Sequence, residues 1–114
     1  EREGGGEEIS LLIQKALEYI REYYDQGITL EEISGRLHVT EEYLSSQFRK
    51  ETGKTFISFL TDYRMEKAVE LLMTTSDKTY IIAEKVGYAD PNYFSYAFKK
   101  QYSMSPSKYR TANS

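Results

Sequence analysis

Residues 82–100, IAEKVGYADPNYFSYAFKK, contain the pattern that decides the fold. A short apolar segment with helical spacing ends at Gly87, and glycine is the residue best suited to the left-handed conformation at a helix end. Asp90 and Pro91 then open a second helix, because Asp caps a helix start and Pro fits its first turn. Two helices separated by so short a break have the layout of a helix-turn-helix unit.

The same pattern occurs earlier in the chain, at an offset of 50 residues. The matched pairs are Tyr43 with Tyr93, Leu44 with Phe94, Phe48 with Phe98, Gly53 with Ser103, and Phe59 with Tyr109. One extra turn residue in the second copy shifts the preceding helix to an offset of 49, which pairs Ser34 with Ala83. We therefore predict two helix-turn-helix units, at 29–52 and 79–102, joined by a longer helix over 56–73.

The rest of the chain extends this all-α pattern. Apolar residues recur at helical spacing from Ile9 to Asp25, and Pro106 opens a last helix. No segment alternates with the two-residue period of a strand. The predicted architecture is all-α with about seven helices: 1–8 is a flexible linker or an expression remnant, 9–110 is the domain, and 111–114 is a frayed tail.

The composition argues against several functional classes. The sequence has no cysteine and one histidine, His38, so disulfides and thiolate metal sites are excluded. It contains neither a phosphate-binding loop nor a carboxylate pair in an apolar setting, and we expect no enzyme activity, cofactor or metal. Because no apolar run approaches the roughly 18 residues of a membrane span and no signal peptide is visible, we expect a cytoplasmic protein.

The charge distribution is uneven. The net charge of the chain is −3, whereas nucleic-acid binders usually carry a basic excess. Residues 78–114, however, hold six basic and two acidic residues, a net charge of +4. Since salt screens exposed charges beyond about 8–10 Å, a local basic segment matters more than the total.

The second-copy motif resembles the C-terminal DNA-binding domain of the AraC/XylS family of bacterial transcription regulators. The resemblance spans Ile9–Arg110 and is carried by Ile82-Ala83, Val86-Gly87-Tyr88, Asp90 to Ser95, Phe98-Lys99-Lys100, Ser105-Pro106 and Tyr109-Arg110, with Tyr63-Arg64, Ala68 and Leu71-Leu72 in the linker helix. His38 and Ser103 depart from it, because glycine is common in the family at the position of His38 and usual at that of Ser103. The resemblance implies duplex DNA as a partner, an upstream sensing or receiver domain as in a response regulator, and contact with RNA polymerase.

Contact residues follow from the general geometry of such units, in which bases are contacted from the N-terminal part of the second helix. The predicted base-reading residues are Glu42, Ser45, Ser46, Asn92, Ser95 and Tyr96. The predicted phosphate-binding residues are Arg49, Lys50, Lys99, Lys100 and Arg110. Each lysine has the alternative of being a solvated surface charge, and Glu42 that of stabilising the helix N-terminus. Tyr96 could stack on a thymine methyl or reach a phosphate.

A helical protein-docking module without DNA binding is the alternative function, since the acidic first half of the chain suits a basic partner. Salt-dependent binding to duplex DNA separates the two functions. A linker helix of about 17 residues is about 25 Å long. With recognition helices reaching beyond each end, we expect contacts to two successive major grooves, about 34 Å apart.

Overall fold

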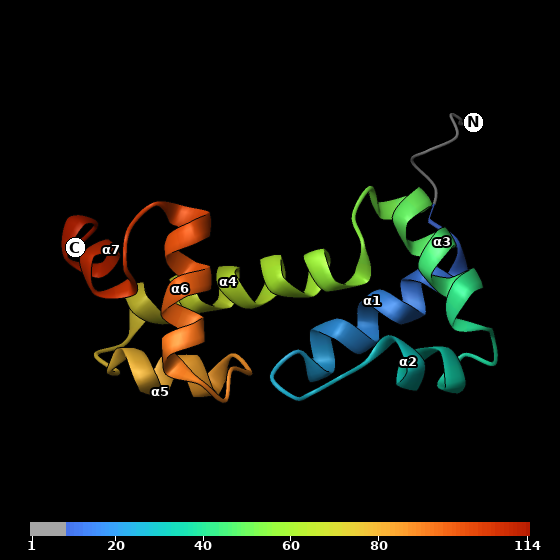
Figure 1. Ribbon diagram of the computed structural model, residues 1–114, viewed down its shortest axis with the longest axis horizontal. Helices are drawn as coiled ribbons and strands as arrows, with labels where there is room; N and C mark the ends of the chain where they lie inside the picture. Colours follow the sequence, from blue (N-terminus) through green and yellow to red (C-terminus); the bar gives the residue numbers. More distant parts are fainter. Residues whose placement is uncertain (1–8) are drawn as a thin grey trace. The chain divides into compact units, whose positions relative to one another are not determined.

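The computed structural model describes residues 9–114, and these residues form seven α-helices and no strand (Figure 1). The helices are α1 Leu11–Tyr23, α2 Leu30–Arg36, α3 Glu41–Thr52, α4 Phe56–Thr74, α5 Thr79–Lys85, α6 Pro91–Tyr102 and α7 Pro106–Ala112. The predicted all-α class is confirmed. The predicted lead-in at 1–8 lies outside the described residues, and α7 continues two residues past the predicted domain end at Arg110.

The chain divides into two compact units, and the boundary falls inside α4, between Thr61 and Asp62. The first unit contains α1, α2, α3 and the start of α4. The second unit contains the remainder of α4 with α5, α6 and α7. Each unit has its own helix-turn-helix pair, α2 packed on α3 and α5 packed on α6.

Side-chain caps set where most of the helices begin. Thr29, Thr40 and Asp90 each accept a hydrogen bond from a backbone N–H in the first turn of the helix that follows, as their residue types predict. Thr29 and Glu32 have the spacing of a capping box, which predicts that the Glu32 side chain turns back to the helix start. The carboxylate of Glu32 accepts a hydrogen bond from the hydroxyl of Tyr19 at 2.6 Å. The helix start is therefore also tied to α1.

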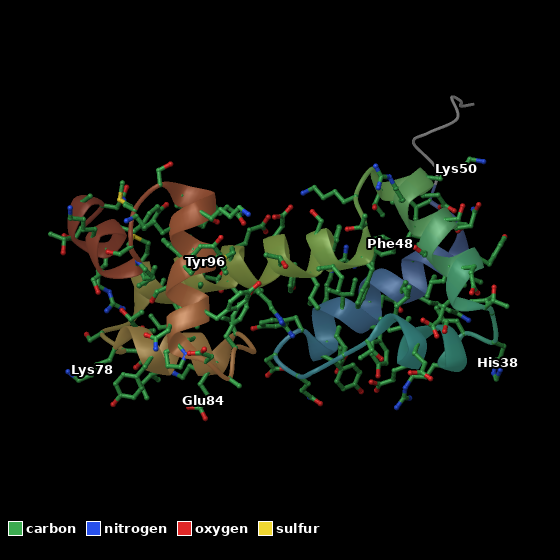
Figure 2. The ribbon with its side chains drawn as sticks, viewed as in Figure 1. His38, Phe48, Lys50, Lys78, Glu84 and Tyr96 are labelled. Atoms are coloured by element: carbon green, nitrogen blue, oxygen red, sulfur yellow. The ribbon has the colours of Figure 1, made fainter. Side chains whose placement is uncertain are left out.

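The two units bury equivalent aromatic side chains. Phe48 is fully buried in the first unit, where its ring meets that of Phe59 edge-on, with centroids 5.5 Å apart and planes at 89°. Phe98 is fully buried in the second unit and meets Tyr109 at 5.5 Å and 86°. The repeat seen in the sequence is thus a repeat in packing. Figure 2 shows Phe48 pointing from α3 into the first unit.

The repeat places a small residue, Ser34 or Ala83, at the same position in the first helix of each pair, and this residue is buried. Ser34 is 4% exposed and Ala83 is fully buried, and each lies in a helix that packs on the second helix of its unit. The Ser34 hydroxyl donates to the carbonyl oxygen of Glu31 at 2.9 Å, which satisfies a polar group that burial would otherwise make costly. A larger side chain at either position would hold the helices apart.

The predicted buried stripes need correction at two equivalent tyrosines. Helical spacing places Tyr43 and Tyr93 in the apolar stripes of the second helices and predicts that both face the core, but their exposed fractions are 53% and 57%. In each second helix the core contact is made by the residue that follows the tyrosine, Leu44 or Phe94, and by the phenylalanine four positions later. The buried face is too narrow to include the tyrosine position, which lies at its edge, so the rings of Tyr43 and Tyr93 extend into solvent.

The buried face of α4 also differs from the expected one. Helical spacing predicts one apolar face that includes Tyr63 and Leu71, but both are only half-buried, whereas Met65 is fully buried. Between Leu60 and Met65 the buried positions step by five residues instead of three or four, and this step coincides with the unit boundary. A single helical period therefore cannot describe α4.

Candidate nucleic-acid interface

In the first unit, α3 presents the predicted contact residues to solvent. Glu42, Ser45, Ser46, Arg49 and Lys50 are all exposed, whereas Leu44 and Phe48 on the opposite face are buried. The helix therefore packs against its unit on one side, and the opposite side, which carries the predicted contact residues, is exposed to solvent. Lys50 extends outward near the end of α3 in Figure 2.

In the second unit, α6 has the same division of faces. Asn92, Tyr96, Lys99 and Lys100 are exposed, and Ser95 is half-buried. The partial burial of Ser95 leaves it less surface for contact than the equivalent Ser45. The structure thus gathers the predicted residues of α6 on one face, and their contacts with DNA stay a prediction.

The N-termini of the two recognition helices differ electrostatically. The first turn of α3 contains Glu41 and Glu42, whereas the first turn of α6 contains no acidic residue. Since the backbone N–H groups of a helix start carry partial positive charge, the glutamates offset this charge in α3. The start of α6 has a single carboxylate, that of the N-cap Asp90, which accepts a hydrogen bond from the backbone N–H of Asn92 at 2.9 Å, so fewer negative charges offset the partial positive charge there.

The basic character of the second unit is smaller than the C-terminal segment alone indicates. Residues 62–114 hold eight basic and six acidic residues, a net charge of +2. Two of the lysines are paired, because Lys85 Nζ lies 2.6 Å from a carboxylate oxygen of Asp77 and Lys67 Nζ lies 3.9 Å from one of Glu70. The exposed Lys99 and Lys100, in the last turns of α6, are the cations closest to the predicted base-reading residues along the chain.

Arg110 has a set of contacts that the sequence did not predict. Its Nε donates to the carbonyl oxygen of Leu72 at 3.0 Å, Nη1 to that of Asp77 at 2.7 Å, and Nη2 to that of Thr75 at 3.0 Å. These acceptors lie at and just beyond the end of α4, where helix carbonyls have no partner within the helix. Arg110 therefore stabilises the end of α4. Its expected phosphate contact stays a prediction and uses at most the remaining N–H groups.

Two tyrosines have shifted pKa values, and both are involved in packing. Burial, followed by the neighbouring Tyr109 and Glu66, raises the pKa of Tyr102. The hydrogen bond to Glu32 is the main cause that raises the pKa of Tyr19. These groups lie outside the exposed faces of α3 and α6 and influence stability.

Residues 9–114 bring together no group of three or more His, Asp or Glu side chains able to hold a metal ion. Among the helices of this described segment, none combines the length and the apolar character that crossing a bilayer requires.

Comparison with known proteins identifies the family. The model of the helix-turn-helix domain family matches residues 33–112. The chain is 37% identical over 98 residues to the lactose operon transcription activator of Staphylococcus xylosus, an alignment that covers 86% of this chain and 35% of the activator. This chain belongs to the AraC-type helix-turn-helix family of transcription regulators.

Solved structures agree with this assignment. The C-terminal domain of AraT, a response regulator from Geobacillus stearothermophilus, is 43% identical with a TM-score of 0.88, and the match covers 90% of this chain and 86% of that domain. The DNA-binding domain of AdpA, solved with a target DNA, has a TM-score of 0.85 over 90% of this chain and 93% of that one. At 23% identity, the second match shows the fold alone.

The comparisons confirm the predicted family and its role in DNA-binding transcription regulation, and they do not favour the docking-module alternative. The chain spans about a third of the length of the curated relatives that it matches. These relatives therefore carry further segments beyond the one that aligns with this AraC-type domain.

Proposed function

We propose that this AraC-type domain binds a specific sequence of double-stranded DNA, with α3 and α6 each entering a major groove. The single observation that carries the proposal is the matched exposure of the two recognition helices. Each buries one face against its unit and presents polar and cationic side chains on the other. An exposed helix face of this kind is what a helix-turn-helix unit inserts into DNA.

Within this proposal, short polar side chains near the helix starts read bases. Asn92 pairs with the N6 and N7 edge of an adenine, and Ser45, Ser46 and Ser95 donate to or accept from base edges. Glu42 accepts from cytosine N4 or stabilises the start of α3. Arg49, Lys50, Lys99 and Lys100 bind phosphates, which positions the domain without selecting a sequence.

The setting of the domain is part of the proposal. We expect an upstream sensing or receiver domain in the whole protein, a cytoplasmic location, RNA polymerase as a further partner, and no catalytic activity. The match to a response-regulator domain supports the receiver alternative. The 19 residues of α4 measure about 28 Å along the helix axis, and this length suits contacts to two successive grooves.

A binding-site selection from random duplex DNA, followed by titration over a salt series, tests the proposal. With roughly four to six phosphate contacts, log affinity should fall with log salt at a slope of about −4 to −5. A selected site with two conserved half-sites about one helical turn apart supports the two-groove arrangement. A slope near zero, or the failure of any sequence to be enriched, contradicts DNA binding and favours protein docking.

A further inference from the structure

Three tyrosine rings form a row in the second unit, and we call Tyr88, Tyr93 and Tyr96 the tyrosine row. The centroids of Tyr88 and Tyr93 lie 6.0 Å apart, and those of Tyr93 and Tyr96 lie 6.2 Å apart. Both separations fall within the range of about 4.5–7 Å at which aromatic rings attract each other. The row continues from the turn before α6 onto the exposed surface of that helix.

The Tyr88 end of the row is fixed. Its ring lies 5.5 Å from that of Phe94, which is fully buried, and the guanidinium of Arg64 lies 5.3 Å from its centroid. The backbone N–H of Tyr88 donates to the carbonyl oxygen of Ala83 at 2.9 Å, which holds the turn in place. Tyr93 therefore contacts the ring of Tyr88, and contacts with the core fix the position of that ring.

The other end of the row is open to solvent. Tyr93 is 57% exposed and Tyr96 is 62% exposed, and Figure 2 shows Tyr96 on the surface of α6. Single exposed apolar side chains are ordinary, but two contacting rings on one helix make a continuous apolar surface. Because the rings already hold each other, little side-chain entropy remains to be lost when a partner binds.

The surroundings of the row favour DNA over an apolar protein partner. Asn92, Tyr96 and Lys99 are spaced i, i+4 and i+7 and share one face of α6. An amide, an aromatic ring and an ammonium group along one stripe match a base edge followed by the phosphate backbone. An apolar protein surface would leave the exposed Lys99 and Asn92 without suitable partners.

The first unit has no equivalent row. The residue equivalent to Tyr96 is Ser46, and the residue equivalent to Tyr88 is Val39. Only Tyr43, the counterpart of Tyr93, is kept. The two recognition helices therefore present different chemistry at equivalent positions, and each half-site should be read differently.

We infer that Tyr96, held in place by Tyr93, contacts the methyl group of a thymine in the half-site of the second unit. The C5 methyl of thymine is the apolar group that base pairs present in the major groove, and it is read by apolar side chains. Tyr96 is then a specificity residue, and Tyr93 and Tyr88 are positioning residues. The inference rests on the proposed function, because it requires α6 to enter a major groove.

Replacement of thymine by 2′-deoxyuridine in the selected duplex tests the inference, since deoxyuridine pairs with adenine but lacks the methyl group. Each thymine of the site is replaced singly, and the affinity of the 114-residue chain is measured for every duplex. At one position in the second half-site we expect binding to weaken about fourfold, the effect of one methyl group removed from an apolar contact.

Variants then identify the side chain responsible. The quantity compared is the ratio of the affinity for the thymine duplex to the affinity for the deoxyuridine duplex at that position. Tyr96→Ser, which introduces the residue found at the equivalent Ser46 of the first unit, should lower this ratio to about one. Tyr96→Phe should leave the ratio at its wild-type value. Tyr93→Ala should lower this affinity ratio, and Tyr93→Phe, which keeps the ring, should leave it close to the wild-type value. If Tyr93 had only a general structural role, its loss would weaken binding to every duplex and would not change the ratio at one thymine. Tyr80→Ser, which removes an exposed tyrosine outside the tyrosine row, is the matched control and should leave the ratio unchanged.

The outcomes separate the inference from the proposed function. If no duplex is enriched, the proposed function fails and the inference fails with it. If a duplex is bound but every deoxyuridine substitution leaves affinity unchanged, the inference alone is overturned. A ratio that survives Tyr96→Ser, or that is lost in Tyr96→Phe, also overturns it. If Tyr96→Ser fails to fold, as judged by circular dichroism, the affinity ratios of the wild type and of Tyr96→Phe still test the inference.

Discussion

Ser103 ends α6 in the same left-handed backbone conformation in which Gly53 ends α3, with φ angles of 67° and 81°. In both caps the backbone N–H donates to the carbonyl oxygen four residues earlier, at 2.7 and 2.9 Å. The turns inside the units show the reverse substitution, since His38 has a φ of 60° and the equivalent Gly87 one of 104°. Each unit therefore has one side chain where its counterpart has glycine.

We predict that Ser103→Gly and His38→Gly each stabilise the protein. The left-handed conformation costs a residue with a side chain about 1–2 kcal/mol. Glycine removes this cost but loses about 0.5–1 kcal/mol through the greater freedom of the unfolded chain. A net gain of about 0.5–1 kcal/mol per substitution should appear in urea denaturation, and an unchanged or lower midpoint would contradict the strain at these positions.

Gly53 and Gly35 form a matched control pair for this argument. A Cβ added at either position meets nothing within 4 Å, but only Gly53 has a positive φ. Gly53→Ala should therefore destabilise the protein by about 1 kcal/mol through backbone strain. Gly35→Ala, inside α2, should stabilise it by about 0.5–1 kcal/mol through helix propensity. Effects of the same sign would show that φ does not decide the outcome.

Arg110 provides a second prediction, on the end of α4. Arg110→Ala removes three hydrogen bonds from a charged donor and should lower the free energy of unfolding by about 2–3 kcal/mol. Arg110→Lys should recover less than half of this loss, because one ammonium group cannot span three carbonyls as the planar guanidinium does. Urea denaturation followed by circular dichroism measures both changes.

The neighbouring Lys108→Ala is the control for Arg110, since Lys108 is an exposed cation on the same helix. It should leave stability nearly unchanged. If Arg110→Ala also left stability unchanged but lowered DNA affinity and flattened its salt dependence, the phosphate contact expected from the sequence would be the main role of Arg110.

Local sequence signals predicted the fold well. The caps at Thr29, Thr40 and Asp90 depend on a side chain and a backbone N–H two or three residues away, so the residue types are sufficient to locate them. The repeat was detectable because buried residues such as Phe48 and Phe98 tolerate few alternatives. The exposed contact face of each recognition helix followed from the position of these buried residues.

Contacts that depend on tertiary packing could not be predicted in the same way. The carbonyl groups that bind Arg110 lie 33 to 38 residues away in the chain, and no local pattern indicates them. Tyr43 and Tyr93 fit a helical apolar stripe, but the width of the buried face decides their exposure, and this width is a property of the packed unit. The tyrosine row was missed for that reason.

Tyr102 leads to a prediction about alkaline stability. Burial raises the pKa of Tyr102 above its ordinary value of 10.0 in the folded protein. The unfolded chain therefore loses this proton at a lower pH, so the stabilisation is fully present below about pH 10 and is lost as the pH rises through the folded-state pKa. Urea midpoints measured from pH 8 to 11 should fall more steeply for the wild type than for Tyr102→Phe.

The exposed Tyr80 supplies the control for the pH series, since it is 55% exposed. Tyr80→Phe should follow the wild-type curve. Parallel curves for the wild type and Tyr102→Phe would instead show that Tyr102 does not couple proton loss to unfolding.

The last prediction separates phosphate binding from base reading on the recognition helices. Lys99→Ala and Lys100→Ala should weaken binding to selected and scrambled duplexes by similar factors, and each should flatten the salt slope by about one, because each removes one released counterion. Asn92→Ala should leave the slope nearly unchanged and reduce the preference for one base by about 1–3 kcal/mol, the value of a bidentate contact to adenine. Ser45→Ala should likewise change preference in the other half-site.

Titration of each variant against both duplexes over a salt series measures these effects, with Lys15→Ala as the control because Lys15 is an exposed cation on α1. The control should change neither affinity nor slope. If the lysine variants altered base preference while Asn92→Ala acted on all sequences alike, the two roles would be exchanged. Equal, sequence-independent losses from every variant would mean that neither helix reads bases, and that specificity comes from the shape and deformability of the DNA.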